Sequence, residues 1–358
     1  MPRRLTLLLL ALAVACDGST SANGPALRFL AVTPAGTTAV RLIEFEAPPL
    51  RERRSLTLST PDTTRVVLAR ADRRGGFYAV QFAGQWPAVD TWELLRYDAD
   101  WQVVARRSAV EIAPGINPNT AFRARLTADG QHLLLAVGAL QSSPAIATLD
   151  PRTLAVEHRS AHPFTFIGSG IPDATSGAEL VLLAPAGDGA VWQDALSGQL
   201  VDSVRIPAAG RVYGARTHRE LYWLPSGGPG SDTLELYDVL TGDVLARTAG
   251  RFGGAALWAG PSPSRLLVDA YWEAVVLDAT TLGELGRLDL TLAGTARFWG
   301  GAPLVPDPAV PSMIIPTSAI NLTPNPVGPP PDGLAIVDIE RPAIVLNKVV
   351  GYTIRLVP

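Results

Sequence analysis

The stretch Leu234-Glu-Leu-Tyr-Asp-Val-Leu-Thr-Gly-Asp-Val-Leu-Ala-Arg-Thr248 consists of an apolar strand, a turn that begins at Asp238, and a second strand. A carboxylate at the first position of a turn accepts backbone N–H bonds and so holds the hairpin. The same pattern recurs along the chain at intervals of 40 to 60 residues. Its acidic positions are Glu46, in a degenerate first copy, and Asp98, Asp150, Asp194, Asp238, Asp278 and Asp338. We interpret all seven as structural turn residues.

Further apolar segments lie between the hairpins, so that each copy offers four strands. In the sixth copy these expected strands are 253–258, 265–270, 274–277 and 285–290. Four strands per unit, repeated around an axis, form the blades of a β-propeller. Residues 25–358 provide seven such blades of about 48 residues each. The pattern therefore predicts an all-β, seven-bladed β-propeller of four-stranded antiparallel blades. A linear β-solenoid is the competing architecture.

The two ends of the chain complement each other. Only three strands are expected in the first copy, at 27–32, 39–45 and 54–58, and one spare apolar segment, 352–357, remains after the last copy. A C-terminal strand that completes the first blade as its innermost strand would close the ring and remove exposed sheet edges. We therefore expect the first blade to be completed by the C-terminal strand.

The N-terminus has the pattern of an export signal. Arg3 and Arg4 precede an apolar run over 5–15, and Cys16, the only cysteine of the chain, follows directly. The run is too short to cross a bilayer about 30 Å thick, which takes about 20 helical residues. We predict a signal peptide over 1–15, a flexible tether over 16–24 and the propeller over 25–358.

The sequence Ala13-Val14-Ala15-Cys16 resembles the lipobox of bacterial lipoproteins, although leucine is more usual in that family where this chain has Ala13. The resemblance implies that Cys16 becomes the lipidated mature N-terminus. Such a chain is held by more than one acyl group, which anchors it stably. It also implies export to the bacterial cell envelope, on the periplasmic face or the cell surface. An ordinary cleaved signal with an incidental cysteine is the alternative.

Composition excludes some functions and supports the strand-rich interpretation. The chain carries 30 basic and 33 acidic residues, a formal net charge of −3, which does not favour a nucleic-acid partner. Its 33 glycines and 31 prolines favour short strands joined by tight turns. With one cysteine, no disulfide can form within the chain, and we expect a monomeric body.

The turns Asp194-Ala-Leu-Ser-Gly198 and Asp238-Val-Leu-Thr-Gly242 resemble those of YVTN-type and quinoprotein-like propeller repeats. These short motifs specify a fold and not an activity. The Trp-Asp pairs of WD40 repeats are absent from the sequence. Propeller lipoproteins that assist outer-membrane protein assembly share the anchor and the fold type, although they have eight blades.

One face of the predicted disk carries a set of polar and aromatic loop residues. This candidate binding face comprises Gln85, Trp86, Asp90, Asn117, Asn119, His162, Asp188 and Arg251. Amide and carboxylate groups at the channel mouth could hold calcium, as in propeller lactonases, but their spacing is not diagnostic. No other cofactor and no catalytic residue is predicted. The proline-rich segment 317–332 is expected to project as a loop that could engage a partner.

Two classes of function follow from these features. The first is an envelope lipoprotein, anchored to the membrane, whose propeller is a platform for a protein or ligand. The second is a metal-dependent hydrolase or lactonase-like enzyme with its site at the channel mouth, which would need several oxygen ligands converging on the axis. The sequence contains no catalytic constellation, which favours the first.

Overall fold

The computed structural model describes most of the chain after residue 25. The described residues are 26–34, 40–58, 63–71, 75–83, 91–114, 121–127, 130–138, 145–161, 164–166, 171–172, 179–185, 190–194, 196–197, 199–204, 210–217, 219–225, 231–252, 254–258, 264–270, 273–290, 305, 309–318, 332–350 and 355–357. The predicted signal peptide, Cys16 and the tether therefore lie outside them. No helix within these ranges is long and apolar enough to span a membrane.

The strands form separate antiparallel sheets. The first sheet holds, in spatial order, β28 (Arg355–Val357), β1 (Leu27–Pro34), β2 (Val40–Ala47) and β3 (Arg51–Thr57). The second holds β4 (Thr63–Arg70), β5 (Phe77–Ala83), β6 (Thr91–Tyr97) and β7 (Val103–Ser108). The third holds β8 (Ala121–Leu126), β9 (Leu133–Gly138), β10 (Ala145–Leu149) and β11 (Val156–Ala161).

Four more sheets follow along the chain. The fourth has β12 (Phe164–Phe166) and β13 (Ile171–Pro172), both paired with β14 (Glu179–Pro185), then β15 (Ala190–Asp194) and β16 (Leu200–Val204). The fifth has β17 (Gly210–Ala215), β18 (Glu220–Pro225), β19 (Ser231–Asp238) and β20 (Val244–Phe252). The sixth has β21 (Gly254–Trp258), β22 (Arg265–Asp269), β23 (Glu273–Asp278) and β24 (Glu284–Asp289). The seventh has β25 (Ser312–Ser318), β26 (Asp332–Asp338) and β27 (Ala343–Val349).

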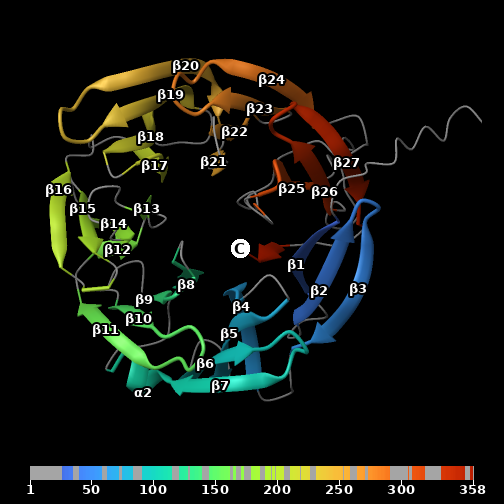
Figure 1. Ribbon diagram of the computed structural model, residues 1–358, viewed down its shortest axis with the longest axis vertical. Helices are drawn as coiled ribbons and strands as arrows, with labels where there is room; N and C mark the ends of the chain where they lie inside the picture. Colours follow the sequence, from blue (N-terminus) through green and yellow to red (C-terminus); the bar gives the residue numbers. More distant parts are fainter. Residues whose placement is uncertain are drawn as a thin grey trace, which may run out of the picture.

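The sheets are arranged around a common centre, with the last strand of each at the rim (Figure 1). The all-β class and the repeated four-stranded antiparallel sheets are thus confirmed. Two sheets differ from the expected four strands. The fourth has five because its inner strand is split into β12 and β13, and the seventh has three within the described residues, which exclude 291–304.

Element boundaries also differ from expectation at a few places. The C-terminal strand begins at Arg355 instead of residue 352, within the described residues. The predicted loop 317–332 loses both ends to strands, because β25 extends to Ser318 and β26 begins at Asp332. A short helix, α2 (Ala109–Ile112), follows β7, and the backbone N–H and hydroxyl of Ser108 donate to the carboxylate of Glu111 at its start. Such a capping interaction stabilises a helix start locally.

All seven sheets share one irregularity at the same position. In each, the register between the two outermost strands shifts one to two residues before the acidic turn position. The shift lies at Leu236/Tyr237 before Asp238, and at Glu44/Phe45 before Glu46. A bulge bends and twists a strand, so its recurrence marks structurally equivalent units.

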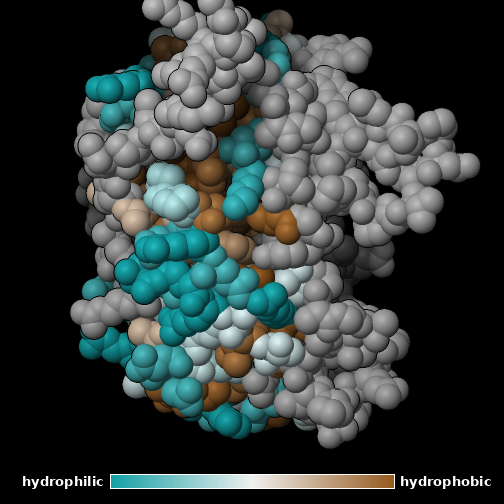
Figure 2. Space-filling view, turned by 90° about the vertical axis from the view of Figure 1, so that its right-hand side faces the viewer, coloured by the Kyte–Doolittle hydropathy of each residue, from teal (hydrophilic) through white to brown (hydrophobic). Residues whose placement is uncertain are grey.

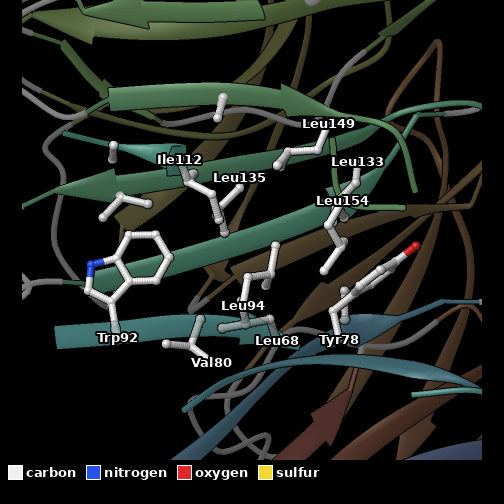
Figure 3. Close-up of a cluster of buried hydrophobic side chains, with 14 of the residues drawn as sticks. Leu68, Tyr78, Val80, Trp92, Leu94, Ile112, Leu133, Leu135, Leu149 and Leu154 are labelled. Atoms are coloured by element: carbon white, nitrogen blue, oxygen red, sulfur yellow. The ribbon is translucent and has the colours of Figure 1, made fainter. Parts of the chain in front are cut away.

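Apolar side chains between neighbouring sheets form the cores. Figure 3 shows Tyr78, Trp92 and Leu94 of the second sheet pointing toward Leu133 and Leu135 of the third. Because side chains alternate along a strand, one sheet can contribute a face to each of two neighbours, as the first sheet does to the seventh and to the second. Burial of these side chains at about 1.5 to 3 kcal/mol each is the main stabilising contribution.

Tyrosines add a second link between sheets. Tyr78 of β5 donates to the carbonyl of Pro151 at 2.7 Å, and Tyr222 of β18 donates to the carbonyl of Ala279 at 2.8 Å. Both tyrosines lie on the second strand of their unit, and both acceptors directly follow a turn aspartate of the next unit. The same device thus joins the second sheet to the third and the fifth to the sixth.

Candidate functional site: a cluster of arginines around Glu46

The six turn aspartates hold backbone amides. In each, the Oδ1 atom accepts hydrogen bonds from the backbone N–H groups of residues two to four positions later. These aspartates are Asp98, Asp150, Asp194, Asp238, Asp278 and Asp338. Hydrogen bonds from Thr281 keep the pKa of Asp278 below its ordinary value. A carboxylate that already accepts several donors is a poor general acid or metal ligand, because binding would cost those bonds.

Glu46 has different partners. It lies within β2, and its carboxylate accepts a hydrogen bond from Arg51 and forms ion pairs with Arg53 at 3.2 Å and Arg28 at 3.9 Å. The hydrogen bond from Arg51 is the main cause that lowers the pKa of Glu46. We call Arg28, Glu46, Arg51 and Arg53 the Glu46 cluster. Its acidic member binds arginine side chains, whereas the turn aspartates bind turn amides.

A second carboxylate of β2 is buried two residues away. Arg54 Nε donates to Glu44 Oε2 at 2.8 Å, and the Arg54 guanidinium stacks over the ring of Trp101 at 4.1 Å from its centroid. Trp101 in turn donates to the carbonyl of Gly75 at 2.9 Å. A side chain at Gly75 would bring its Cβ within 2.8 Å of Arg54, and its φ of 104° also favours glycine. The stacking of Arg54 on Trp101 thus joins the first sheet to the second unit.

In the Glu46 cluster, the charged groups exposed to solvent are those of the arginines. Three guanidinium groups surround the single carboxylate of Glu46, a surplus of two positive charges. The side chains of Arg28, Arg51 and Arg53 are 50%, 64% and 37% exposed, while that of Glu46 is 11% exposed. Guanidinium groups present several donors to an anionic group at once. The chemistry available to the Glu46 cluster is the binding of an anion.

A groove of about 220 Å³ lies between β20 of the fifth sheet and the sixth sheet. Phe252, Val275 and Leu277 supply apolar lining, and Glu284 and Arg287 supply charge. Arg287 donates to both Glu273 and Glu284, and these bonds hold its pKa above the ordinary value. Because one guanidinium is already paired with two carboxylates, these three groups leave no surplus positive charge to attract an anion.

Most of the predicted binding face cannot be placed. Gln85, Trp86, Asp90, Asn117, Asn119, His162 and Asp188 lie outside the described residues. The backbone of Arg251 lies in β20, and its side chain is outside the described set. Within the ranges given above, no group of three or more His, Cys, Asp or Glu side chains could hold a metal ion. The calcium prediction concerns residues beyond those ranges and stays a prediction.

Sequence reasoning did not single out the Glu46 cluster. Two signals were present: glutamates two apart at Glu44 and Glu46, and the run Arg51-Glu-Arg-Arg54 shortly after. Residues two apart share one face of a strand, so both glutamates face the same neighbours. A hairpin between these segments brings the opposite charges together.

The radial sheets define an all-β protein of the β-propeller class. No protein-family profile matches the chain, and no curated protein matches it. Among solved structures, BamB from Moraxella catarrhalis is similar with a TM-score of 0.46 and 13% identity, covering 91% of this chain and 90% of that one. Dihydro-heme d1 dehydrogenase NirN, in complex with DHE, also has a TM-score of 0.46, with 12% identity, covering 91% of this chain and 74% of that one. At such identities neither match indicates a ligand or a partner.

Proposed function

We propose that this protein is a lipid-anchored protein of the bacterial cell envelope. Its body is a closed seven-bladed β-propeller that serves as a rigid platform for a protein partner. The observation that carries the platform is the rim, where apolar side chains of the outer strands are exposed to solvent. They are Val104 of β7, Leu200 of β16, Leu245 of β20, Leu285 of β24 and Val345 of β27.

Two observations support the closed ring. The register shift that all seven sheets share supports seven equivalent units. In addition, β28 pairs antiparallel with β1, with Val357 opposite Leu30 and Arg355 opposite Val32. In a ring in which the last strand pairs with the first unit, the edge of β1 is covered and both ends of the folded chain are held in one sheet.

The rim suits a partner better than it suits chemistry. Outer strands of a propeller each keep one unpaired edge, to which another chain can add hydrogen bonds. Apolar side chains beside that edge supply the area that a protein interface buries. The nearby carboxylates of Glu235 and Glu273 are engaged by Arg247 and Arg287, so they are not available as acids or bases.

The anchor rests on the N-terminal sequence. Arg3 and Arg4, the apolar run over 5–15 and the single Cys16 support it. The test is growth with labelled palmitate: the wild type incorporates label and fractionates with membranes. Cys16→Ser loses the label and enters the soluble envelope fraction, because Ala13-Val14-Ala15 still suits an ordinary signal peptidase. An unlabelled wild type would disprove the anchor and leave the fold untouched.

The platform is tested separately by photocrosslinking in cells. A photoreactive phenylalanine analogue replaces Leu285 or Val345 on the rim, and Val110, exposed on α2, serves as the control position. We expect both rim positions to yield one adduct of the same mass that is absent at the control position. Identical adduct patterns at all three positions would refute a specific rim partner.

A further inference from the structure

The Glu46 cluster lies where the chain enters the folded body. Arg28 is the second residue of β1, and it stands opposite Glu46 of β2, which stands opposite Arg51 of β3. The register therefore places arginines from the first and third strands at the end of the sheet that receives the N-terminal segment. This end is the part of the body nearest to Cys16 along the chain.

Among the described residues, the excess of positive charge is confined to the Glu46 cluster and does not extend to the other ion pairs of exposed arginines. Within the part of the chain that the structure describes, other ion pairs of exposed arginines leave no excess of positive charge: Arg41 pairs with Glu52, Arg247 with Glu235, and Arg287 with both Glu273 and Glu284. The whole chain carries a formal net charge of −3. Two unbalanced positive charges on an acidic protein thus mark one surface of the first sheet. Figure 2 shows hydrophilic side chains gathered on the side of the molecule that holds β3.

The distance to the predicted anchor is short. Ten residues lie between Cys16 and Leu27, and the eleven Cα–Cα steps that join them span at most about 40 Å when extended. A flexible chain of this length has a root-mean-square span of about 20 Å. A body tethered at Cys16 therefore keeps this end of β1 within tens of ångströms of the lipid headgroups at all times.

We propose that the Glu46 cluster binds the anionic headgroups of the membrane to which the protein is anchored; the inference rests on the lipid anchor proposed above. Phosphate groups of lipids match the donors of the three guanidinium groups. An acidic protein offers the same charge, but it must diffuse to the cluster, whereas the tether supplies headgroups continuously. Binding holds the first sheet toward the bilayer and leaves the outer strands β16 and β20, across the ring in Figure 1, facing away.

Vesicle binding of the unlipidated Cys16→Ser chain tests the inference without using the anchor. Vesicles of phosphatidylglycerol supply anionic headgroups, and vesicles of phosphatidylcholine supply neutral ones. The variant Arg28→Gln/Arg51→Gln removes the surplus and leaves Arg53 to neutralise Glu46. An arginine near an anionic surface contributes about 1 kcal/mol, so the affinity for anionic vesicles should fall about 30-fold. Binding to neutral vesicles should not change.

The control variant is Arg247→Gln on β20. Arg247 has nearly the exposure of Arg51, 62% against 64%, but belongs to a balanced pair on another sheet. Its affinity for anionic vesicles should stay within about twofold of the parent chain, since an exposed balanced pair contributes little. An equal loss in both variants, or no loss in either, would overturn the inference. Weaker binding to a polyglutamate peptide with unchanged vesicle binding would also overturn it, in favour of an acidic protein.

Two measurements keep the test decisive if the double glutamine variant does not fold. Arg28→Lys/Arg51→Lys keeps both charges and should retain anionic vesicle binding within about threefold, because headgroup attraction depends mainly on charge. The parent chain should prefer anionic to neutral vesicles at about 10 mM salt, where the Debye length is about 30 Å, and lose that preference at about 1 M. A parent chain without the preference refutes the inference. Palmitate labelling of the wild type is independent of these results, so failure of the anchor is recognised separately.

Discussion

Leu356→Ala tests how far the C-terminal strand holds the body together. Leu356 and Val357 are neighbours in β28 and therefore point to opposite faces of the first sheet. Leu356, 8% exposed, packs in the core shared with the seventh sheet, beside Ile314 and Ile336. Val357, 1% exposed, packs in the core shared with the second sheet, beside Phe77. Two adjacent side chains thus serve two different cores.

The magnitude follows from this burial. Truncation of a buried leucine to alanine costs about 2 to 5 kcal/mol. Leu356 lies in a three-residue strand that can shift, so we expect the lower part of that range, about 2 to 3 kcal/mol. Val357→Ala removes two methyl groups and should cost about 2 kcal/mol. Because both side chains hold the same strand, the double variant should lose less than the sum.

The assay is urea unfolding of the full chain, followed by tryptophan fluorescence. Val345→Ala is the matched control, because Val345 is an exposed apolar residue of the neighbouring sheet and should cost less than about 0.5 kcal/mol. Deletion of residues 352–358 should expose the edge of β1 and cause aggregation, detected by light scattering. A Leu356→Ala midpoint equal to that of the control, or a monomeric deletion variant with an unchanged midpoint, would refute the closing role of β28.

Three further predictions concern the repeated units. Tyr222→Phe removes the hydrogen bond to Ala279 and should cost about 1 kcal/mol. Burial raises the pKa of Tyr222, so the folded protein keeps the phenol protonated, whereas the unfolded chain ionises near pH 10. The wild type should therefore lose stability above that pH, and the variant should lose less. The measurement is the urea midpoint of both proteins at about pH 8 and at about pH 11. Asp278→Ala removes the acceptor of its turn and should cost about 1 kcal/mol near neutral pH. The lowered pKa of Asp278 means that this contribution is present above about pH 4 and is lost as the pH falls below it, so the midpoints of wild type and variant should converge in acid. Gly286→Ala would bring a methyl group into a steric clash with the ring of Pro342 and should cost about 1 to 3 kcal/mol; an unchanged melting temperature would show that the two sheets can separate freely there.

The strand-turn-strand units could be predicted because their signals are local. Alternating apolar residues determine which face of a strand is buried, and an aspartate with a nearby glycine favours the turn that follows. Asp238 and Gly242 lie four residues apart, and the turn between them needs no distant contact. The same rule missed the split inner strand β12 and β13, since short segments carry too little periodicity to assign.

The Glu46 cluster could not be predicted in the same way. Arg28 and Glu46 are eighteen residues apart, and their contact depends on the register between β1 and β2. A slip of one residue would turn every side chain of a strand to the other face. The bond from Tyr78 to Pro151 spans 73 residues and depends on how two sheets pack. Neither contact corresponds to a characteristic spacing of residues in the sequence from which it could have been predicted.

The sequence by itself determined the all-β class, the repeated antiparallel hairpins and the aspartate that holds the turn in six of them, because hydrophobic alternation and turn chemistry act over a few residues. It also carries the proposal of an anchored N-terminus, through Cys16. The sequence also led us to expect a C-terminal strand in the first sheet, but only the tertiary structure decided the register of β28 on β1, and that three arginines surround Glu46 beside the incoming chain. Those contacts join segments far apart in sequence, so they arise only when register and sheet packing bring the segments together.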